Sequence, residues 1–368
     1  MIPVFEPVIG KEEIDAVVGA LQRGEISGTF SPTIERFEKE FAKYCGTKHG
    51  IAVTSGTTAL HLAIAAADLK PGDEVLVSAS TNIATALAAY HNQCVAVAID
   101  SENTTWNLDL DLIEQYITPR TKAIIPVHLY GHPVDMDRLM KIAKKHNLVV
   151  IEDCAESHGA TVRGKMTGSF GDMSCFSFYA NKIMTTGEGG MVLTNDDKLA
   201  ERLKLLRNLA FQTPRFFHEQ AGYNFRMTGP QAAMGVAQLA KLDSVIEAKR
   251  KMARTYNAFL EKVPSIQRPF EAEWAKNVYW MYAVVVREEF PMSRDQLMKF
   301  LRDKGIDTRT FFCPMNIQPF LMKQPGFRKI DCPVAERIWE RGLYLPSTHT
   351  LSEASIKTVC DAIAEAAR

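Results

Sequence analysis

The first two thirds of the chain alternate short apolar runs with segments of helical periodicity. Apolar runs bounded by polar or glycine residues predict buried strands, and they cover residues 50–54, 74–78, 95–99, 123–127, 148–152, 173–178 and 190–194. Helical patterns lie between several of them, at residues 57–67, 109–116 and 135–146. Strands and helices in this rhythm predict an α/β fold, a mostly parallel sheet with helices on both faces.

The pattern changes in the last third of the chain. Residues 226–259 predict one or two long helices, rich in Ala, Gln, Leu and Lys. Beyond them the chain predicts strands at 278–286 and 307–312 and helices at 294–304 and 353–368. We therefore predict two domains, a large domain over residues 1–250 and a small C-terminal α+β domain over residues 251–368.

Composition narrows the range of functions. The 368 residues include 43 basic and 43 acidic side chains, so no basic excess indicates a nucleic-acid or membrane-surface partner. The N-terminus lacks the features of a signal peptide, and no apolar stretch approaches the ~20 residues that cross a bilayer. Seven cysteines are scattered without a CxxC pair, which predicts a cytoplasmic protein with no metal centre.

Candidate site residues follow the predicted strands, because ligands of α/β sheets bind beyond the carboxyl ends of the strands. Ser55, Gly56 and Thr57 lead into a helix, whose free N–H groups and dipole favour an anion. Asp153 ends a buried strand, where a carboxylate needs a partner. Each segment is also typical of an ordinary helix N-cap, and alone neither predicts a site.

Lys182 stands between Ser177, at the end of a strand, and the glycine-rich residues 187–190. A lysine that bonds to a carbonyl carbon must be held and partly desolvated, whereas an isolated lysine usually lies in solvent. The loop at 222–227 adds Asn224 and Arg226 beside aromatic residues. An anion cradle, a carboxylate and a lysine occur here in the chain order that pyridoxal 5′-phosphate (PLP) enzymes use.

Longer motifs carry a resemblance that runs nearly end to end. "FSFYANKIMTTGEGGMV", "VIEDCAES", "TSGTTALHLA", "GYNFRMT" and "GLYLPS" resemble the DegT/DnrJ/EryC1/StrS sugar aminotransferases, a family of fold-type I PLP enzymes. The resemblance implies an enzyme that moves an amino group from L-glutamate to a keto sugar nucleotide. "TWNLD", "ITPRTKAIIPVHLYGHPVDMD" and "VYWMY" resemble its GDP-perosamine synthase branch, which implies GDP-4-keto-6-deoxy-D-mannose as acceptor. UDP- and dTDP-linked keto sugars are the alternatives.

The resemblance also implies roles for individual residues. Lys182 bonds to PLP and moves the proton, Asp153 pairs with the pyridine nitrogen, and Glu156 lies near the ring hydroxyl. The phosphate is held by Ser55, Gly56, Thr57 and Ser177. Asn224 reaches the cofactor phosphate of the neighbouring subunit, which implies a homodimer with shared active sites. Arg226 contacts an anionic group of the donor or the substrate.

Two positions depart from the family pattern. Asn82 stands where most members have an aromatic residue that stacks on the cofactor ring, and Asn316 stands where most have a histidine of the small domain. We therefore expect Asn82 to leave one face of the ring less covered, unless Tyr130 or Tyr179 covers it. Asn316 is expected to contact the substrate differently from that histidine.

Other interpretations are less well supported by the residues. A PLP-dependent sugar dehydratase of the same fold would carry histidine in place of Lys182, and a non-catalytic relative would not need Lys182, Asp153 and Ser177 together. Residues 159–165 resemble the start of a P-loop but lack the following hydroxyl residue, and a surface hairpin is expected there. His128 and His132 have metal-ligand spacing, yet neighbouring glycine and proline exclude the helix that would pair them.

Overall fold

The computed structural model describes residues 1–214 and 216–368. Its central sheet has the strand order β1 (His49–Val53), β9 (Gly190–Thr194), β8 (Met173–Ser177), β5 (Val149–Asp153), β4 (Thr121–Ile125), β2 (Glu74–Ser78) and β3 (Val95–Ile99). β9 runs antiparallel to both of its neighbours, and the remaining pairs are parallel. These strands match the predicted apolar runs closely, so the predicted α/β architecture is confirmed.

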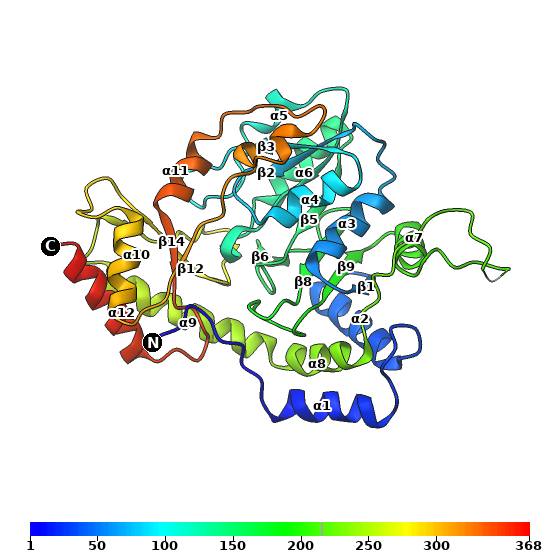
Figure 1. Ribbon diagram of the computed structural model, residues 1–368, viewed down its shortest axis with the longest axis horizontal. Coiled ribbons are helices and arrows are strands. Elements are labelled where there is room, and N and C mark those ends of the chain that lie inside the picture. Colours follow the sequence, from blue (N-terminus) through cyan, green and yellow to red (C-terminus); the bar gives the residue numbers. More distant parts are fainter. Residues whose placement is uncertain (215) are drawn as a thin grey trace.

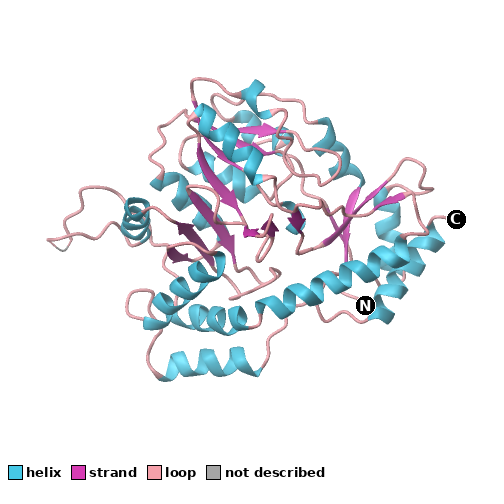
Figure 2. Cartoon of the chain, turned by 180° about the vertical axis from the view of Figure 1, so that it is seen from behind, coloured by secondary structure: helices cyan, strands magenta, loops and turns pink. Residues whose placement is uncertain are grey.

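Helices cover both faces of this sheet (Figures 1 and 2). Successive strand residues point to opposite faces, so the apolar side chains of both faces need to be covered. Ile51 and Val53 of β1 pack in the core formed with α3 (Gly56–Ala66), α4 (Ile83–His91), α6 (Met136–His146) and α7 (Asp197–Arg207). Ala52, between them, packs in the opposite core with α2 (Pro32–Cys45) and α8 (Gly229–Ala240). α1 (Lys11–Gln22) lies outside α8 (Figure 1).

A second sheet forms in the last third of the chain. Its strand order is β10 (Ile266–Gln267), β12 (Tyr282–Val286), β14 (Gly342–Leu345) and β13 (Arg309–Thr310), and it packs against α9 (Leu242–Leu260), α10 (Arg294–Asp303) and α12 (Glu353–Ala366). The boundary predicted at residues 250 and 251 falls inside α9, which continues through it. The division into two domains remains a prediction.

Some predicted elements are shorter than the pattern indicated. The strand expected at 278–286 begins only at Tyr282, because Tyr279 has a positive φ of 49° and its N–H bonds to the Asn277 side chain. The helix expected at 109–116 is reduced to α5 (Ile113–Tyr116), since the Asp109 carboxylate accepts from the Asp111 N–H and forms a turn. The strand expected at 307–312 is reduced to β13.

Residues 159–165 belong to the expected hairpin. β6 (Thr161–Val162) and β7 (Lys165–Met166) pair antiparallel, with β11 (Ala275–Lys276) on the other edge of β6. Arg163 and Gly164 at the turn both have positive φ, which a two-residue hairpin turn requires. This geometry excludes a phosphate-binding loop leading into a helix at this position.

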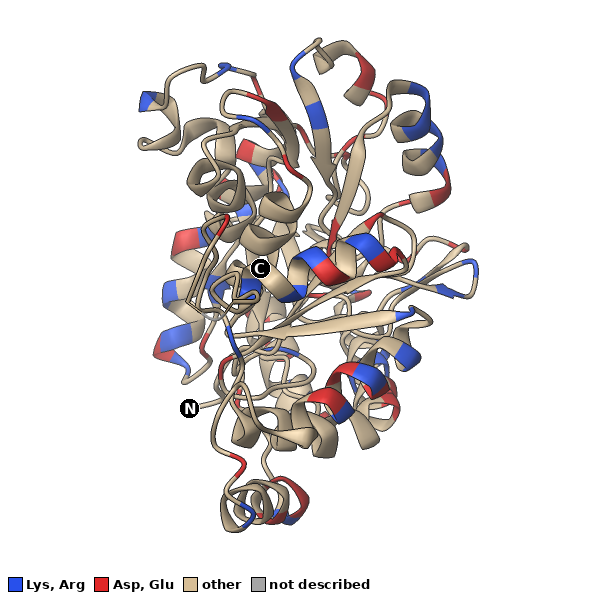
Figure 3. Cartoon of the chain, turned by 90° about the vertical axis from the view of Figure 1, so that its right-hand side faces the viewer, with Lys and Arg blue, Asp and Glu red and all other residues tan. Residues whose placement is uncertain are grey.

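The surface carries mixed charge. On the side shown in Figure 3, basic and acidic residues are interspersed along the helices. Within residues 1–214 and 216–368, no helix combines the length and the apolarity needed to cross a bilayer. The seven cysteines, all among the described residues, are free thiols.

Candidate functional site

A cavity of about 280 Å³ opens at the carboxyl ends of β1, β5 and β8. Strand ends and the turns after them position its polar side chains, as the parallel sheet predicts. Among the residues expected from the sequence, the cavity brings together Ser55, Gly56, Thr57, Asn82, Asp153, Glu156, Ser177 and Lys182. Trp280, Phe312 and Tyr344 come from the C-terminal third of the chain and close the opposite side.

Lys182 follows β8 in a turn in which its N–H donates to the Tyr179 carbonyl. Its Nζ lies 3.8 Å from Oε1 of Glu156 and 3.7 Å from the centroid of the Trp280 ring. The side chain is only 11% exposed, and this burial lowers the pKa of Lys182, while Glu156 and Asp153 oppose the shift. A lysine amine that loses its proton more readily is a better nucleophile toward carbonyl carbon.

Asp153 is the last residue of β5, and its carboxylate is buried. Oδ2 accepts a hydrogen bond of 2.8 Å from Oγ1 of Thr85, and Oδ1 accepts one of 3.1 Å from the Ala155 N–H. Burial raises the pKa of Asp153, and the Thr85 hydroxyl opposes the rise. A buried carboxylate that keeps its charge is suited to a cationic N–H partner.

Glu156 lies beside Lys182 and is also buried. Its Oε2 accepts a hydrogen bond of 2.7 Å from the Tyr130 N–H, in a turn where Tyr130 has a positive φ of 52°. Burial raises the pKa of Glu156 to about 7, although Lys182 acts to lower it. The carboxyl group therefore changes charge near neutral pH.

The anion cradle expected from the sequence sits at the start of α3. Ser55 caps this helix, because its Oγ accepts from the Thr58 N–H at 3.1 Å. A Cβ added at Gly56 would lie 2.6 Å from Cβ of Ser177, so the helix N-terminus and the end of β8 are in direct contact. The capping role and the anion-binding geometry occur together, since the first-turn N–H groups of a helix lack intrahelical partners.

Three expected site residues do not line this cavity. Asn224 is exposed, and Nη1 of Arg226 donates to Oδ1 of Asn208 at 2.9 Å. Asn316 is buried, with its Nδ2 donating to Oε1 of Glu336 at 2.7 Å. Asn82 does line the cavity, but its Oδ1 accepts from the Ala84 N–H and caps α4.

The sequence reasoning missed several residues of the site. Thr85 carries no local signal, because Thr81 precedes α4 and the Asp153 partner of Thr85 is 68 residues away. Trp280 and Tyr344 carry no such signal, since only the packing of the second sheet brings them to Lys182. Tyr130 and Tyr179 were the alternatives to Asn82 for covering the cofactor ring. Tyr130 is buried and does not line the cavity, whereas Tyr179 is 48% exposed and lines it.

A buried cluster of His128, Glu152 and Cys154 has ligand atoms within 4.8 Å of one another. The Glu152 carboxylate accepts from the N–H groups of Gly168, Phe170 and Gly171, and from Nε2 of His128 at 3.3 Å. Because Nδ1 of His128 accepts from the Val134 N–H, Nε2 carries the proton. These hydrogen bonds hold the loop that precedes β8 in place, which explains why the three side chains lie together.

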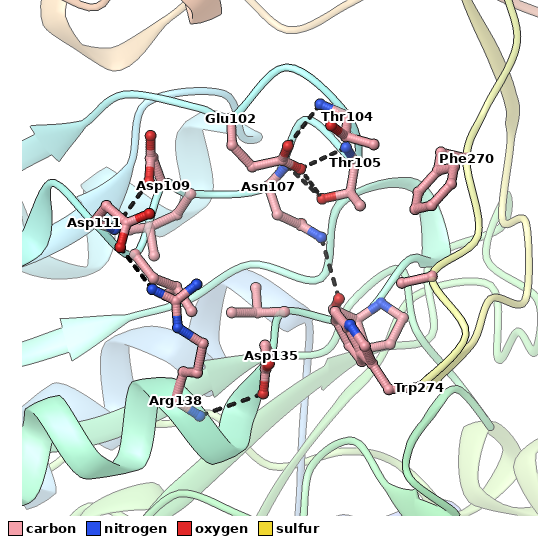
Figure 4. Close-up of a pocket in the computed structure, with 15 residues that line it drawn as sticks. Glu102, Thr104, Thr105, Asn107, Asp109, Asp111, Asp135, Arg138, Phe270 and Trp274 are labelled. Carbon is pink, nitrogen blue, oxygen red and sulfur yellow. Dashed lines mark hydrogen bonds and ion pairs between the residues drawn. The ribbon is translucent and has the colours of Figure 1, made fainter.

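A second cavity, of about 340 Å³, shares no lining residue with the first. Its carboxylates bond to groups beside them, as Figure 4 shows. Glu102 accepts from the N–H groups of Thr104 and Thr105, and Asp111 pairs with Arg138 at 2.7 Å. These bonds stabilise the loops that form the cavity wall.

Comparison with known proteins finds relatives that match nearly the whole chain. Residues 7–364 match the model of the DegT/DnrJ/EryC1/StrS aminotransferase family. The GDP-perosamine synthase of Caulobacter vibrioides is 43% identical over 98% of this chain and 97% of its own length. That of Escherichia coli O157:H7 is 39% identical over 99% and 98%. The structure of DesV from S. venezuelae, in complex with a ketimine intermediate, is 37% identical, with a TM-score of 0.90 over 97% of this chain and 95% of DesV.

Proposed function

Because this chain belongs to the DegT/DnrJ/EryC1/StrS aminotransferase family, we propose that it transfers an amino group from L-glutamate to GDP-4-keto-6-deoxy-D-mannose, with PLP as cofactor. The observation that carries the proposal is the buried Lys182, which shares one cavity at the carboxyl edge of the sheet with the carboxyl groups of Asp153 and Glu156. The choice of sugar nucleotide rests on the two relatives named GDP-perosamine synthase. A cytoplasmic location is proposed from the cysteine pattern alone.

The cavity residues fit PLP in three respects. The α3 N-terminus offers backbone N–H groups to a phosphate, and Gly56 leaves room that a Cβ would fill. Asp153 offers a buried carboxylate to a ring nitrogen, and Lys182 offers an amine to an aldehyde. We assign Ser55, Gly56, Thr57 and Ser177 to the phosphate, Asp153 and Glu156 to the ring, and Lys182 to the covalent bond.

When bound, PLP supplies an electron sink for bond changes at the amino-bearing carbon. The chain's own residues support that chemistry. Lys182, whose pKa burial lowers, provides an amine that can accept a proton from the donor carbon and return one to the acceptor carbon. Asp153 keeps a positive charge on the ring nitrogen, and Glu156 holds a proton near Lys182 until about neutral pH.

We also propose a homodimer in which Asn224 completes the neighbouring site. Two features of the single chain support it. Asn224 is exposed and lies outside the cavity lining of its own chain. The outer face of α1 carries Ile14, Val18 and Leu21, which are 56%, 44% and 51% exposed. An apolar helix face of this kind is typical of a contact between subunits.

The test is an end-point assay of the purified protein with L-glutamate and GDP-, UDP- and dTDP-linked 4-keto-6-deoxy hexoses, read by mass spectrometry. We expect the GDP-linked sugar to gain an amine first when the three compete. Lys182→Ala is the control and should lose both the turnover and the visible absorbance of bound PLP. Preference for a UDP- or dTDP-linked sugar would replace the proposed acceptor, and wild-type turnover by Lys182→Ala would overturn the mechanism.

A further inference from the structure

Two buried threonines form a line that ends at Asp153. Oγ1 of Thr81 lies 2.8 Å from Oγ1 of Thr85, and Oγ1 of Thr85 lies 2.8 Å from Oδ2 of Asp153. Thr81 and Thr85 are 1% and 0% exposed, so water does not compete for these hydroxyl groups. Thr81 lies directly before the Asn82 cap and Thr85 lies in the first turn of α4, so their hydroxyl groups meet at the start of the helix.

The line of hydroxyl groups has one direction. An ionised carboxylate only accepts hydrogen bonds, and a threonine hydroxyl has one hydrogen to donate. Thr85 therefore donates to Asp153, and the remaining bond must run from the Thr81 hydroxyl to Thr85. Bonds in such a chain polarise one another, and a bond to a charged acceptor is stronger than one between neutral groups.

The start of α4 does not need these hydroxyl groups for capping. Asn82 supplies the cap through its Oδ1, which accepts from the Ala84 N–H at 3.0 Å. The Thr85 N–H donates to the Asn82 carbonyl, so the Thr85 side chain is available to face β5. A purely structural role in capping therefore does not explain the contact with Asp153.

Asp153 is in surroundings that oppose its charge. Burial has the largest effect and raises its pKa; the Thr85 hydroxyl is the largest opposing influence, ahead of the Ala155 N–H, Lys182 and His128. The other titratable groups facing it are the carboxyl group of Glu156 and the buried thiols of Cys154 and Cys175. Glu152, the neighbouring carboxylate in β5, points to its own N–H donors on the other side of the strand.

We propose that Thr81 and Thr85 are positioning residues which keep Asp153 ionised and directed into the cavity, so that it can hold a cationic ring nitrogen. The two hydrogen bonds from Thr81 to Thr85 and from Thr85 to Asp153, called the hydroxyl relay below, act on the carboxylate and do not touch the substrate. This inference rests on the proposed function only for its consequence in catalysis. The effect on Asp153 itself is a property of the chain without any cofactor.

The first experiment measures the titration of Asp153 in the full chain without PLP, by carbon-13 NMR of labelled aspartate, with Asp153→Asn to assign the resonance. Thr85→Val keeps the shape and removes the donor, and should raise the pKa of Asp153 by about one unit, since hydrogen bonds to charged groups are worth that much. Thr81→Val should shift it in the same direction by less. Thr85→Ser, which restores the hydroxyl, should titrate like the wild type.

Thr167→Val is the matched control, because Thr167 is a buried threonine outside the cavity lining whose hydroxyl donates to the Ser157 carbonyl. It should leave the titration of Asp153 unchanged. An Asp153 resonance that titrates alike in Thr85→Val, Thr81→Val and the wild type would overturn the proposal.

A second measurement follows the single-turnover reaction of the PLP-loaded protein with L-glutamate. Thr85→Val should lower its rate about tenfold, with Thr85→Ser near the wild type and the apparent affinity for glutamate little changed. A shifted Asp153 titration in a protein that neither binds PLP nor reacts with glutamate would support the relay and contradict the proposed function. An unshifted titration in a fully active enzyme would contradict the relay and support the proposed function.

Discussion

Lys182, Asp153 and Glu156 lie in one buried cluster, and the environment of each disfavours its charged form. Burial lowers the pKa of Lys182 and raises those of the two carboxyl groups. The mutual attraction between the amine and the carboxylates offsets only part of this effect. Burial therefore makes the Lys182 amine easier to deprotonate, which favours proton transfer at this residue.

The effect of Glu156 on stability has a defined sign. Its pKa rises from 4.5 in the unfolded chain to about 7 in the folded protein. Between these values the folded protein binds the extra proton, so the free energy of unfolding falls as pH rises from 4.5 to about 7. We predict that Glu156→Gln, which can still accept from the Tyr130 N–H, gains in melting temperature over the wild type across this interval.

Melting curves of both proteins at several pH values in this range check the prediction. The exposed Glu261→Gln serves as control and should follow the wild type throughout. A difference between Glu156→Gln and the wild type that stays constant with pH would show that Glu156 does not titrate there.

Residues that precede or follow a strand were predictable from the sequence, because the strand pattern fixes where they lie. This is why Ser55, Asp153 and Lys182 were expected at one edge of the sheet, and they do line one cavity. Asn224 and Arg226 lie outside the cavity of their own chain, and their proposed contacts with a second subunit cannot follow from strand order. Thr85 was overlooked because its partner Asp153 is 68 residues away.

At the scale of elements, the buried strands were predicted best, since most of their residues are apolar and buried. The short segments of the C-terminal third were predicted less well, because contacts distant in sequence determine where they begin and end. α11 (Pro333–Arg341) is an example: Asp100, after β3, accepts from the N–H groups of Val334 and Ala335 at its first turn. The sequence around α11 contains no sign of this cap.

Lys249 attaches α9 to the backbone beside the second sheet. This side chain is 2% exposed, and its Nζ donates to the Trp280 carbonyl at 2.7 Å and to the Ser347 carbonyl. The first bond holds the backbone of the residue whose ring covers Lys182. The helix therefore connects the position of Trp280 to the packing of β12 and β14.

We predict that Lys249→Met lowers the melting temperature, because two buried carbonyl groups lose their donor at about 1–3 kcal/mol each. Burial lowers the pKa of Lys249 from 10.5 to about 7, so between these values the unfolded chain binds a proton that the folded protein lacks. Wild-type stability relative to the variant should therefore increase as pH rises above about 7. Thermal unfolding at about pH 6 and about pH 9 tests this sign, with exposed Lys251→Met as the matched control.

At the scale of the whole molecule, two groups of apolar side chains are exposed among residues 1–214 and 216–368. One is the set of exposed apolar side chains of α1, Ile14, Val18 and Leu21, on the helix that packs beside α8 (Figure 2). The other is formed by Phe211 and Phe217, which lie between α7 and α8 and are 38% and 60% exposed. Both are explained if a second copy of the chain covers them.

The shared-site homodimer predicts complementation between two inactive variants. Lys182→Ala lacks the amine, and Asn224→Ala lacks the residue proposed to reach the neighbouring site. In a hybrid dimer, the intact Lys182 of one subunit meets the intact Asn224 of the other in one of the two sites. After full exchange of equal amounts, half of the dimers are hybrids, so activity should recover to about a quarter of the wild-type value.

Native mass spectrometry of differently tagged subunits establishes the exchange before activity is measured. The control mixes Lys182→Ala with the double variant Lys182→Ala/Asn224→Ala, which offers no intact site and should stay inactive. Recovery only in the first mixture means that each site draws residues from both subunits. Confirmed hybrids that remain inactive would instead assign Asn224 to its own chain, and the exposed apolar face of α1 would then need another partner.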